Sequence, residues 1–213
     1  MATLLSINIG RPEIILPHKS PTGINKQPVL TAQITTLGVV DDAVLDTKHH
    51  GGLDQAVYMY FQHDYQFWER ELGHALRPGQ FGENLTIGEI DSTDIGIGDR
   101  LTLGDVVLEV SGHRTPCATF AAQMGDPKWV KRFAQARRPG AYARVLHEGV
   151  VHPGDAVAYT PFSGTRVRLS DTMALDGRSH TLDAATLRWA LSAPIHMKTR
   201  AKYEARLAEL GEA

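Results

Sequence analysis

The stretch LTLGDVVLEV, residues 101–110, determines the fold class that the sequence predicts. Apolar and β-branched residues flank Gly104-Asp105 on both sides, and a glycine in this position tolerates the positive φ of a tight turn. The stretch therefore predicts a β-hairpin. A second stretch, ARVLHEGVV at residues 143–151, has the same pattern with Glu148-Gly149 at its centre and predicts a second hairpin.

Short runs rich in β-branched and aromatic residues continue this pattern through the first two thirds of the chain. They predict strands at residues 4–9, 55–61, 100–103, 106–110, 141–146 and 155–159. Many short strands with turns between them are typical of a β-barrel or a β-sandwich. We therefore expect a mainly β fold with a few inserted helices.

Apolar residues at helical spacing predict the inserted helices at residues 63–76, 118–124 and 127–137. Tyr65 and Trp68 lie on one face of the first helix, and Trp129 and Phe133 are four residues apart in the third. We interpret both aromatic pairs as core residues.

The composition changes after TPFSG, residues 160–164, and the sequence beyond it is helical. Helices are expected at 183–192 and 196–210, and Gly177-Arg178-Ser179 interrupts the segment before them. The sequence thus predicts a β domain over residues 1–162 and a helical tail over residues 163–213.

The bulk composition excludes several classes of protein. Apolar residues make up 42% of the 213 residues, charged residues 22%, and the net charge is −2, which gives no reason to expect a nucleic acid or an anionic membrane as partner. The first residues lack the pattern of a signal peptide, and no apolar run is long enough to cross a bilayer. One cysteine cannot form an internal disulfide, which suits a reducing cytoplasm, where we expect this protein.

Three clusters could carry chemistry. Lys48-His49-His50-Gly51-Gly52 precedes an apolar strand, and its glycines allow backbone amides to approach an anion while Lys48 supplies charge; the alternative is a tight turn between strands. GQFGENL, residues 79–85, places a carboxylate and an amide in a glycine-rich loop that could bind the edge of a heterocycle; the alternative is a β-bulge with polar surface residues.

The third cluster, HRTPCATF at residues 113–120, contains the single cysteine. Pro116 favours an extended approach, so a helix can begin just after Cys117, where its free N–H groups favour a thiolate. The alternative is a small buried hydrophobic residue. A Cys–His nucleophile lacks a local signature here, and a zinc site lacks ligand spacing, whereas a thiolate that holds a softer metal beside an anion-binding loop would use all three clusters.

In this order, KHHGGLDQAV, GQFGENLT and SGHRTPCATF resemble the MOSC proteins, named for the C-terminal domain of molybdenum-cofactor sulfurases, and most of all the standalone bacterial YiiM-like type. The likeness covers residues 3–162, and the tail resembles the three-helix appendage of that type. The resemblance implies a β-barrel that binds a molybdopterin cofactor, with Cys117 as the molybdenum ligand. The positions that match cofactor-lining residues are Lys48, His49, Gly51, Gly52, Asp54, Asn84 and Arg114.

The resemblance also implies an activity. Standalone members reduce N-hydroxylated compounds such as 6-hydroxylaminopurine and take electrons from a separate flavin- or iron–sulfur-containing partner. A proton donor is needed for such a reaction, and His50, Glu83 and His113 are the candidates. A carrier of the cofactor or of sulfur, without turnover of its own, is the alternative function, and a Cys–His hydrolase is the third.

Overall fold

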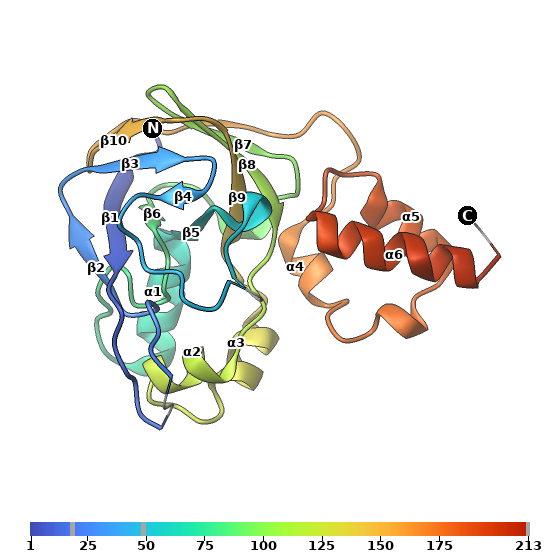
Figure 1. Cartoon of the computed structure of the whole chain (residues 1–213), viewed down its shortest axis with the longest axis horizontal. Helices are drawn as coiled ribbons and strands as arrows, with labels where there is room; N and C mark the ends of the chain where they lie inside the picture. The colour runs from blue at the N-terminus through green and yellow to red at the C-terminus, as the bar shows by residue number, and fades with distance from the viewer. Residues whose placement is uncertain (18–19, 48–49, 212–213) are drawn as a thin grey trace.

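The computed structural model describes residues 1–17, 20–47 and 50–211. A body rich in strands is joined to a helical tail that projects from one side, and the C-terminus lies at the far end of the tail (Figure 1). The strands are β1 (Leu4–Gly10), β2 (Lys26–Val29), β3 (Ala32–Thr35), β4 (Gly38–Val39), β5 (Val57–Phe61), β6 (Leu85–Ile87), β7 (Arg100–Leu103), β8 (Val106–Gly112), β9 (Ala141–His147), β10 (Gly149–Val151) and β11 (Ala158–Thr160). The helices are α1 (Gln62–Leu72), α2 (Ala118–Gln123), α3 (Trp129–Ala136), α4 (Leu169–Met173), α5 (Ala184–Leu191) and α6 (Met197–Glu209), with short 3-10 turns η1 (Leu53–Gln55), η2 (Ser92–Asp94) and η3 (Ser179–Thr181).

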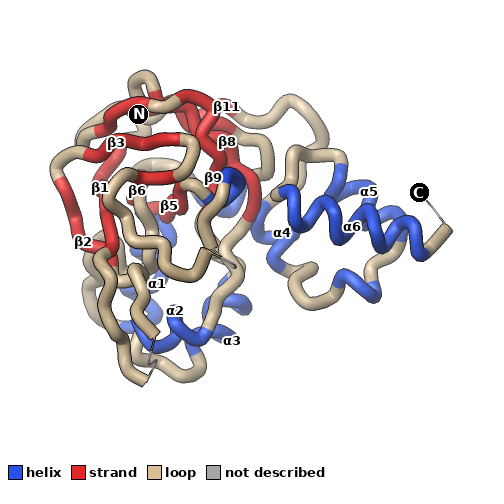
Figure 2. Tube along the Cα trace, in the orientation of Figure 1, coloured by secondary structure: helices blue, strands red, loops and turns tan. Residues whose placement is uncertain are grey.

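The body contains one large mixed sheet. Its eight strands run in the order β11-β7-β8-β9-β5-β6-β1-β2, and a second sheet has the order β10-β3-β4. β5 and β6 are parallel, with α1 between them in the chain, and the other pairs are antiparallel. Figure 2 shows the strands gathered in the upper part of the body, with α1, α2 and α3 at its lower end.

The expected closed barrel is not formed, and helices account for about as many residues as strands, so the description "mainly β" is only partly right. β11 and β2 remain at the two edges of the sheet. The chain just before β11 does approach β1: Thr3 forms an isolated bridge with Ala156, and Leu4 N–H donates to Asp155 C=O at 2.9 Å. This contact is a bridge between irregular segments, because β1 already pairs with β2 and β6 over most of its length.

One of the two hairpins is confirmed and the other is wrong. β7 and β8 pair across Gly104-Asp105, with Leu103 opposite Val106. β10, in contrast, pairs with β3 and not with β9. Both edges of β9 are occupied, by β5 on one side and β8 on the other, so the residues after Glu148 must leave for the second sheet.

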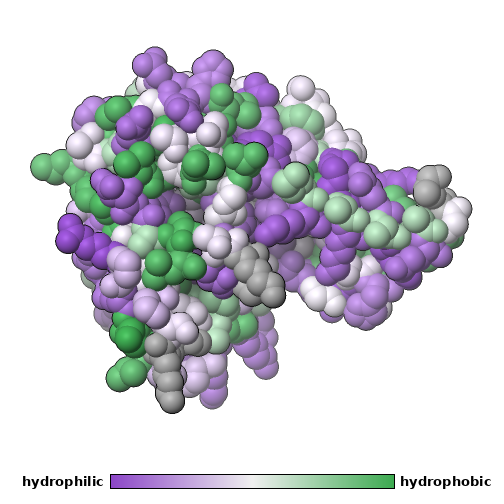
Figure 3. Space-filling view, in the orientation of Figure 1, coloured by the Kyte–Doolittle hydropathy of each residue, from purple (hydrophilic) through white to green (hydrophobic). Residues whose placement is uncertain are grey.

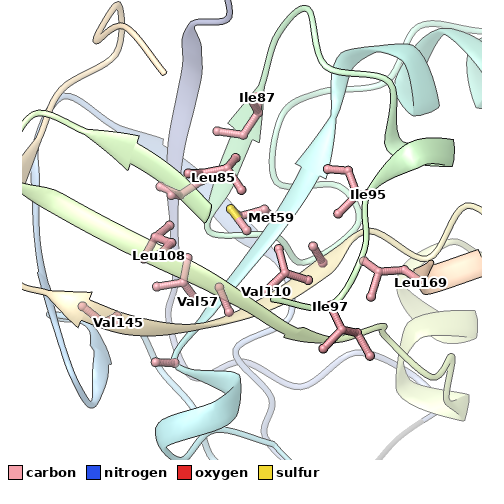
Figure 4. Packing of buried hydrophobic residues seen from close by; sticks show 14 of the residues in the cluster. Val57, Met59, Leu85, Ile87, Ile95, Ile97, Leu108, Val110, Val145 and Leu169 are labelled. Carbon is pink, nitrogen blue, oxygen red and sulfur yellow. The ribbon is translucent and has the colours of Figure 1, made fainter. Parts of the chain in front are cut away.

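A continuous apolar core fills the space enclosed by the main sheet. Its members include Met59, Leu85 and Val110 from three different strands, and Figure 4 shows their side chains pointing toward one another. The strand positions that face this core are β-branched or aliphatic and are fully buried, which is what the apolar runs in the sequence predicted.

A second core lies against the helical end of the body and is aromatic, and it confirms our interpretation of the two aromatic pairs. Trp68 on α1 packs on Trp129 of α3 with 4.5 Å between ring centroids, and its ring is parallel to that of Phe133 within 6°. Such contacts stabilise by about 0.5–1.5 kcal/mol each beyond the area they bury. This aromatic core fixes α1, α2 and α3 beside one another and thereby positions the segment that carries Cys117.

The helical tail has the expected helices, and the break at Gly177-Arg178-Ser179 is also found, between α4 and η3. Its connection to the body is less abrupt than the predicted boundary at residue 162. Val167 and Leu169 are buried in the main core, and Ile97 N–H donates to Val167 C=O at 2.9 Å. In Figure 4, Leu169 lies beside Ile95 and Ile97. The first residues of the tail thus complete the core of the body.

No helix among the described residues has the length and apolarity needed to cross a bilayer. The face of the tail seen in Figure 3 is mostly hydrophilic, while that of the body mixes hydrophilic and hydrophobic residues.

Candidate functional site

A cavity of about 210 Å³, which we call the thiol cavity, opens on the side of the body where the irregular loops lie. Its wall is made by the segment before β2, by residues 42–46, 50–51 and 55–56, by Tyr58 of β5, by Gly82 and Asn84, and by the turn that leads into α2. Of the residues named from the sequence, it collects Gly51, Asn84, Arg114 and Cys117. Segments that are far apart in the chain therefore converge on one space.

The glycine pair follows the loop in left-handed conformations. Gly51 has φ 75° and Gly52 has φ 82°, values that a side chain would strain, so glycine is required for the turn itself. Gly51 and the neighbouring His50 line the thiol cavity, whereas Gly52 does not. Lys48 and His49, which the sequence suggested for anion binding, lie outside the described residues.

Cys117 stands at the N-cap of α2 in extended conformation, directly after Pro116, as the sequence predicted. Its side chain lines the thiol cavity. Burial on its own would raise the pKa of the thiol, but the hydrogen-bonding side chain of His50 and the positive charge of Arg114 outweigh burial and lower the pKa to about 6. Cys117 is therefore a thiolate at neutral pH.

Arg114 is the most unusual charged group in this wall. It is 5% exposed, and its guanidinium lies over the rings of Phe120 and Tyr58, at 4.4 Å and 4.9 Å from their centroids. Within the described residues it forms no ion pair, and its Nε has no hydrogen-bond partner. A buried cation that lacks a carboxylate partner is costly, and an anionic ligand in the cavity would supply that partner.

Lys26 and Asp42 form a buried ion pair in the same wall and were not found from the sequence. Asp42 also accepts from Gly10 N–H at 2.7 Å and from the side-chain amide of Asn84 at 2.9 Å. Asn84 in turn accepts from Tyr58 N–H at 3.2 Å. Most of the polar capacity of Asn84 is thus used in joining strands, so its place in the wall is largely structural. No pattern in the sequence could have paired Lys26 with Asp42, because Lys26 begins β2 whereas Asp42 lies in a separate loop after β4.

Asp54 and Gly52, which the resemblance assigned to cofactor binding, do not line the cavity. The Asp54 carboxylate turns toward the tail instead, where it accepts from Arg144 Nε at 2.8 Å and from Met197 N–H at 2.6 Å. Its assignment to cofactor binding remains a prediction that this geometry does not support. Asp54 fastens the start of α6 to the body.

The three candidate proton donors are separated by the structure. His50 lies in the thiol cavity beside Cys117. Glu83 is fully buried away from the cavity and accepts hydrogen bonds from Tyr65, Thr86 and two backbone amides. His113 faces a second cavity, where its Nδ1 is 2.9 Å from Thr172 Oγ1 and its Nε2 is 3.0 Å from Asp176 Oδ2. Of the three, only His50 adjoins the thiolate.

The described residues contain no group of three or more His, Cys, Asp or Glu side chains that could hold a metal ion by themselves. What the thiol cavity offers is one soft thiolate, one unpaired guanidinium and several hydrogen-bonding groups. This donor set fits a ligand that is anionic and brings most of a metal's coordination shell with it, because the protein would then need to add only one sulfur.

Comparison with known proteins agrees with this geometry. Residues 46–158 match the MOSC domain, a range that includes the glycine pair, Asn84, Arg114 and Cys117. The uncharacterized protein YflK of Bacillus subtilis is 37% identical over 155 residues, which cover 71% of this chain and 70% of that protein. A Gibberella moniliformis protein named "Reductase" is 35% identical over 125 residues, which cover 54% of this chain but only 22% of that protein.

The fold also has a solved counterpart. The crystal structure of YiiM from Geobacillus stearothermophilus superposes with a TM-score of 0.79 at 26% identity, and the match covers 97% of this chain and 100% of that one. The likeness includes the tail, since nearly the whole chain is matched. The protein described here therefore belongs to the MOSC domain family and is of the standalone, YiiM-like kind.

Proposed function

We propose that the thiol cavity binds a molybdenum cofactor and that the protein uses it to reduce N-hydroxylated compounds such as 6-hydroxylaminopurine. The observation that carries the proposal is the pairing of a low-pKa thiolate, Cys117, with the unpaired buried guanidinium of Arg114 in one wall. Membership of the MOSC family and a relative named as a reductase support the same function.

Each residue of the wall would have a distinct task. Cys117 would give one soft thiolate ligand to the metal, which prefers sulfur. Arg114 would bind the anionic part of the pterin, and the bound anion would supply the partner that its charge lacks. The cofactor itself would supply the two-electron chemistry, while the protein binds, orients and tunes it.

The net reaction needs two protons and two electrons. R–NHOH, two electrons and two protons give R–NH₂ and water: one proton goes to the hydroxyl oxygen, which leaves as water when the N–O bond breaks, and the other goes to the nitrogen. His50 is the described candidate nearest to Cys117 for holding a proton. The chain has a single cysteine and so cannot ligate an iron–sulfur cluster of its own, and electrons would come from a separate flavin or iron–sulfur protein.

The test is cofactor analysis of protein produced in a host that makes the cofactor. Wild type is expected to contain close to one molybdenum and one pterin per chain and to reduce 6-hydroxylaminopurine with an artificial electron donor. In Cys117→Ser, X-ray absorption at the molybdenum edge should show one sulfur fewer, and turnover should fall to background. Folded wild type without molybdenum or pterin would refute the proposal.

A second function, hydrolysis by a Cys–His pair, is favoured by one observation, the proximity of His50 to the Cys117 thiolate. Such a hydrolase would act without any cofactor. If metal-free protein reacts with an activated ester and releases an initial burst of the leaving group, the result would support a hydrolase. Turnover that requires molybdenum would exclude it.

A further inference from the structure

The second cavity, which we call the tail cavity, lies between the body and the tail and has a volume of about 230 Å³. The body contributes Gln55, Ile97, Tyr142 and the segment from Ser111 to Thr115, and the tail contributes residues from α4, α6 and the loops beside them. Without the tail this space would be open surface. The tail therefore makes a cavity that the MOSC body alone does not have.

Two side chains, Gln55 and Tyr142, line both cavities and thus form the partition between them. Within the described residues, neither the Gln55 amide nor the Tyr142 hydroxyl has a hydrogen-bond partner. The other tyrosines of the aromatic core are satisfied: Tyr58 donates to Pro139 C=O at 2.8 Å, and Tyr60 to Arg138 C=O at 3.1 Å. Tyr142 is only 8% exposed as a residue, and it lines the wall that the two cavities share.

A hydroxyl and an amide that line a cavity and have no partner among the described residues are free to hydrogen-bond a ligand there. A ligand group that extends through the partition would satisfy both Tyr142 and Gln55. A hydroxyl attached to nitrogen suits them, since it can donate to the amide oxygen of Gln55 and accept from the phenol.

The two cavities differ in charge. The thiol cavity has an unpaired guanidinium, which suits an anion. In the tail cavity the carboxylate of Asp176 faces His113, and Lys198 lies in the same wall, while burial lowers the pKa of His196 and keeps its imidazole neutral at neutral pH. The rest of its wall offers hydroxyls, imidazoles and the Tyr203 ring. This environment suits an uncharged, flat, hydrogen-bonding ring better than an ion.

We propose that the tail cavity is the substrate chamber: it holds the ring of an uncharged N-hydroxylated heterocycle or amidine, whose N–OH group reaches past Gln55 and Tyr142 toward Cys117. This inference rests on the proposed reductase function, and it assigns the tail a role in substrate binding. Gln55 and Tyr142 are the residues that orient the reacting group.

Gly112 provides a direct test, because a side chain at this position would enter the tail cavity. A Cβ built there meets only the Cβ of His196 at 3.8 Å, and the backbone is not in the left-handed region. Gly112→Leu should therefore fill the chamber without displacing the backbone of β8. Ala205→Leu adds the same side chain at an exposed position of α6 and serves as the matched control.

Binding of 6-hydroxylaminopurine is measured first by calorimetry on cofactor-free protein, in which no turnover occurs, and then as KM and kcat of molybdenum-loaded protein. Gly112→Leu is expected to weaken binding and to raise KM at least tenfold at unchanged molybdenum content, while Ala205→Leu matches wild type. Tyr142→Phe, which removes one hydroxyl, should weaken binding about five- to tenfold.

Equal binding and equal KM for wild type, Gly112→Leu and Tyr142→Phe would overturn the substrate chamber. The two proposals fail differently. If Gly112→Leu loses binding and molybdenum-loaded wild type does not reduce the compound, the substrate chamber is supported and the reductase function is refuted. If both variants reduce the compound with the same KM and kcat as wild type, the reductase function is supported and the substrate chamber is refuted.

Discussion

Arg114 is buried, which disfavours its charge, but the nearby Tyr142, Tyr58 and Cys117 outweigh burial and raise its pKa overall. Two aromatic faces offer cation–π attraction of roughly 1–2 kcal/mol in total, but no carboxylate balances the buried charge among the described residues. Residues kept in such surroundings are commonly functional, because folding alone would favour an apolar side chain of similar size.

Replacing Arg114 with Met should affect cofactor binding without lowering the stability of the cofactor-free protein. Met retains the apolar contact with Tyr58 and Phe120, and the Cys117 thiol can bind a proton once the nearby positive charge is gone, so cofactor-free Arg114→Met should be about as stable as wild type. Retention of the cofactor should fall. Thermal denaturation of cofactor-free protein and molybdenum content after gel filtration measure the two effects. A variant that loses stability but keeps its cofactor would show that Arg114 is structural.

The Cys117 thiol should titrate well below the ordinary value of about 8.5 for a cysteine. In cofactor-free protein, the rate of alkylation by iodoacetamide should rise through a pH of about 6 and then level off, because the thiolate is the reactive form. Of the two groups that lower the Cys117 pKa, His50 has the larger effect. In His50→Ala the midpoint of the alkylation rate profile should therefore move to higher pH, and the alkylation rate at pH 6 should fall. A midpoint that stays near 6 in His50→Ala would leave Arg114 as the main cause.

The sequence was a good guide to single residues wherever a local rule applies. Pro116 before Cys117 and the positive φ at Gly51 and Gly52 follow from backbone sterics, and the structure has both. It could not find Lys26, Asp42 or Tyr142, because their importance depends on which distant segments meet them. It also assigned Asp54 to the cofactor site, when the nearest partners of Asp54 are Arg144 and the start of α6.

At the scale of elements, the loop at residues 79–86 shows how a polar cluster is used structurally. Glu83 accepts from Tyr65 Oη at 2.5 Å, from Gly79 N–H at 2.7 Å and from Thr86 Oγ1 at 2.8 Å on one oxygen, and from Phe81 N–H at 3.2 Å on the other. This carboxylate therefore holds the loop against α1 and β6. Glu83 does not line the thiol cavity, whereas Asn84 of the same loop does, so the binding of a heterocycle by this loop stays a prediction.

Glu83→Gln should destabilise the protein by about 1–3 kcal/mol, because the amide nitrogen of Gln would face a donor where the carboxylate oxygen accepted. The effect should depend on pH. Burial raises the pKa of Glu83, so in wild type the folded state binds the proton more tightly than the unfolded state, and stability contributed by this group decreases as pH rises from about 4.5 toward the raised pKa. Urea denaturation at several pH values should show that the free energy of unfolding decreases less with rising pH in Glu83→Gln than in wild type. If the free energy of unfolding decreases equally with pH in wild type and in the variant, Glu83 does not cause this pH dependence.

The sequence predicted the strands whose two faces are both buried, but it did not predict which strand pairs with which. β5, β8 and β9 are apolar runs in the centre of the sheet and were found. β10 was found as a strand but given the wrong partner, because a turn-like sequence does not reveal that both edges of β9 are taken. The same limitation explains the barrel: strand spacing predicts many strands, but closure depends on whether the last edge finds a free partner.

At the scale of the whole molecule, the tail is joined to the body by more than its linker. Asp99, which is fully buried, accepts from Tyr159, Phe162 N–H and Gly96 N–H, and it forms an ion pair with Arg166 of the tail. Farther along, Met197 N–H at the start of α6 donates to Asp54. Two buried carboxylates of the body thus depend on groups that the tail supplies.

Truncation tests this interdependence. A chain that ends at Ser163 loses Val167 and Leu169 from the main core, and each buried aliphatic side chain contributes about 2–5 kcal/mol when its loss leaves a cavity. It also leaves Asp99 buried without the Arg166 charge, so the total loss approaches the roughly 5–15 kcal/mol by which a domain is stable. We expect this chain to be insoluble or to melt far below wild type.

A chain that ends at Leu175 is the informative comparison, because it keeps Arg166, Val167 and Leu169 but removes α5 and α6 and so opens the tail cavity. It should fold with lower stability than the full chain, because α5 and α6 supply Leu187 and Leu207 to the main core. It should retain the thiol cavity, since no described residue that lines this cavity comes from the removed part. Differential scanning fluorimetry and molybdenum content compare the three chains, and KM for 6-hydroxylaminopurine should rise in the longer truncation. If the chain ending at Ser163 is as stable as the one ending at Leu175, residues 164–175 do not belong to the core of the body, and the domain boundary lies at residue 162 as the sequence predicted.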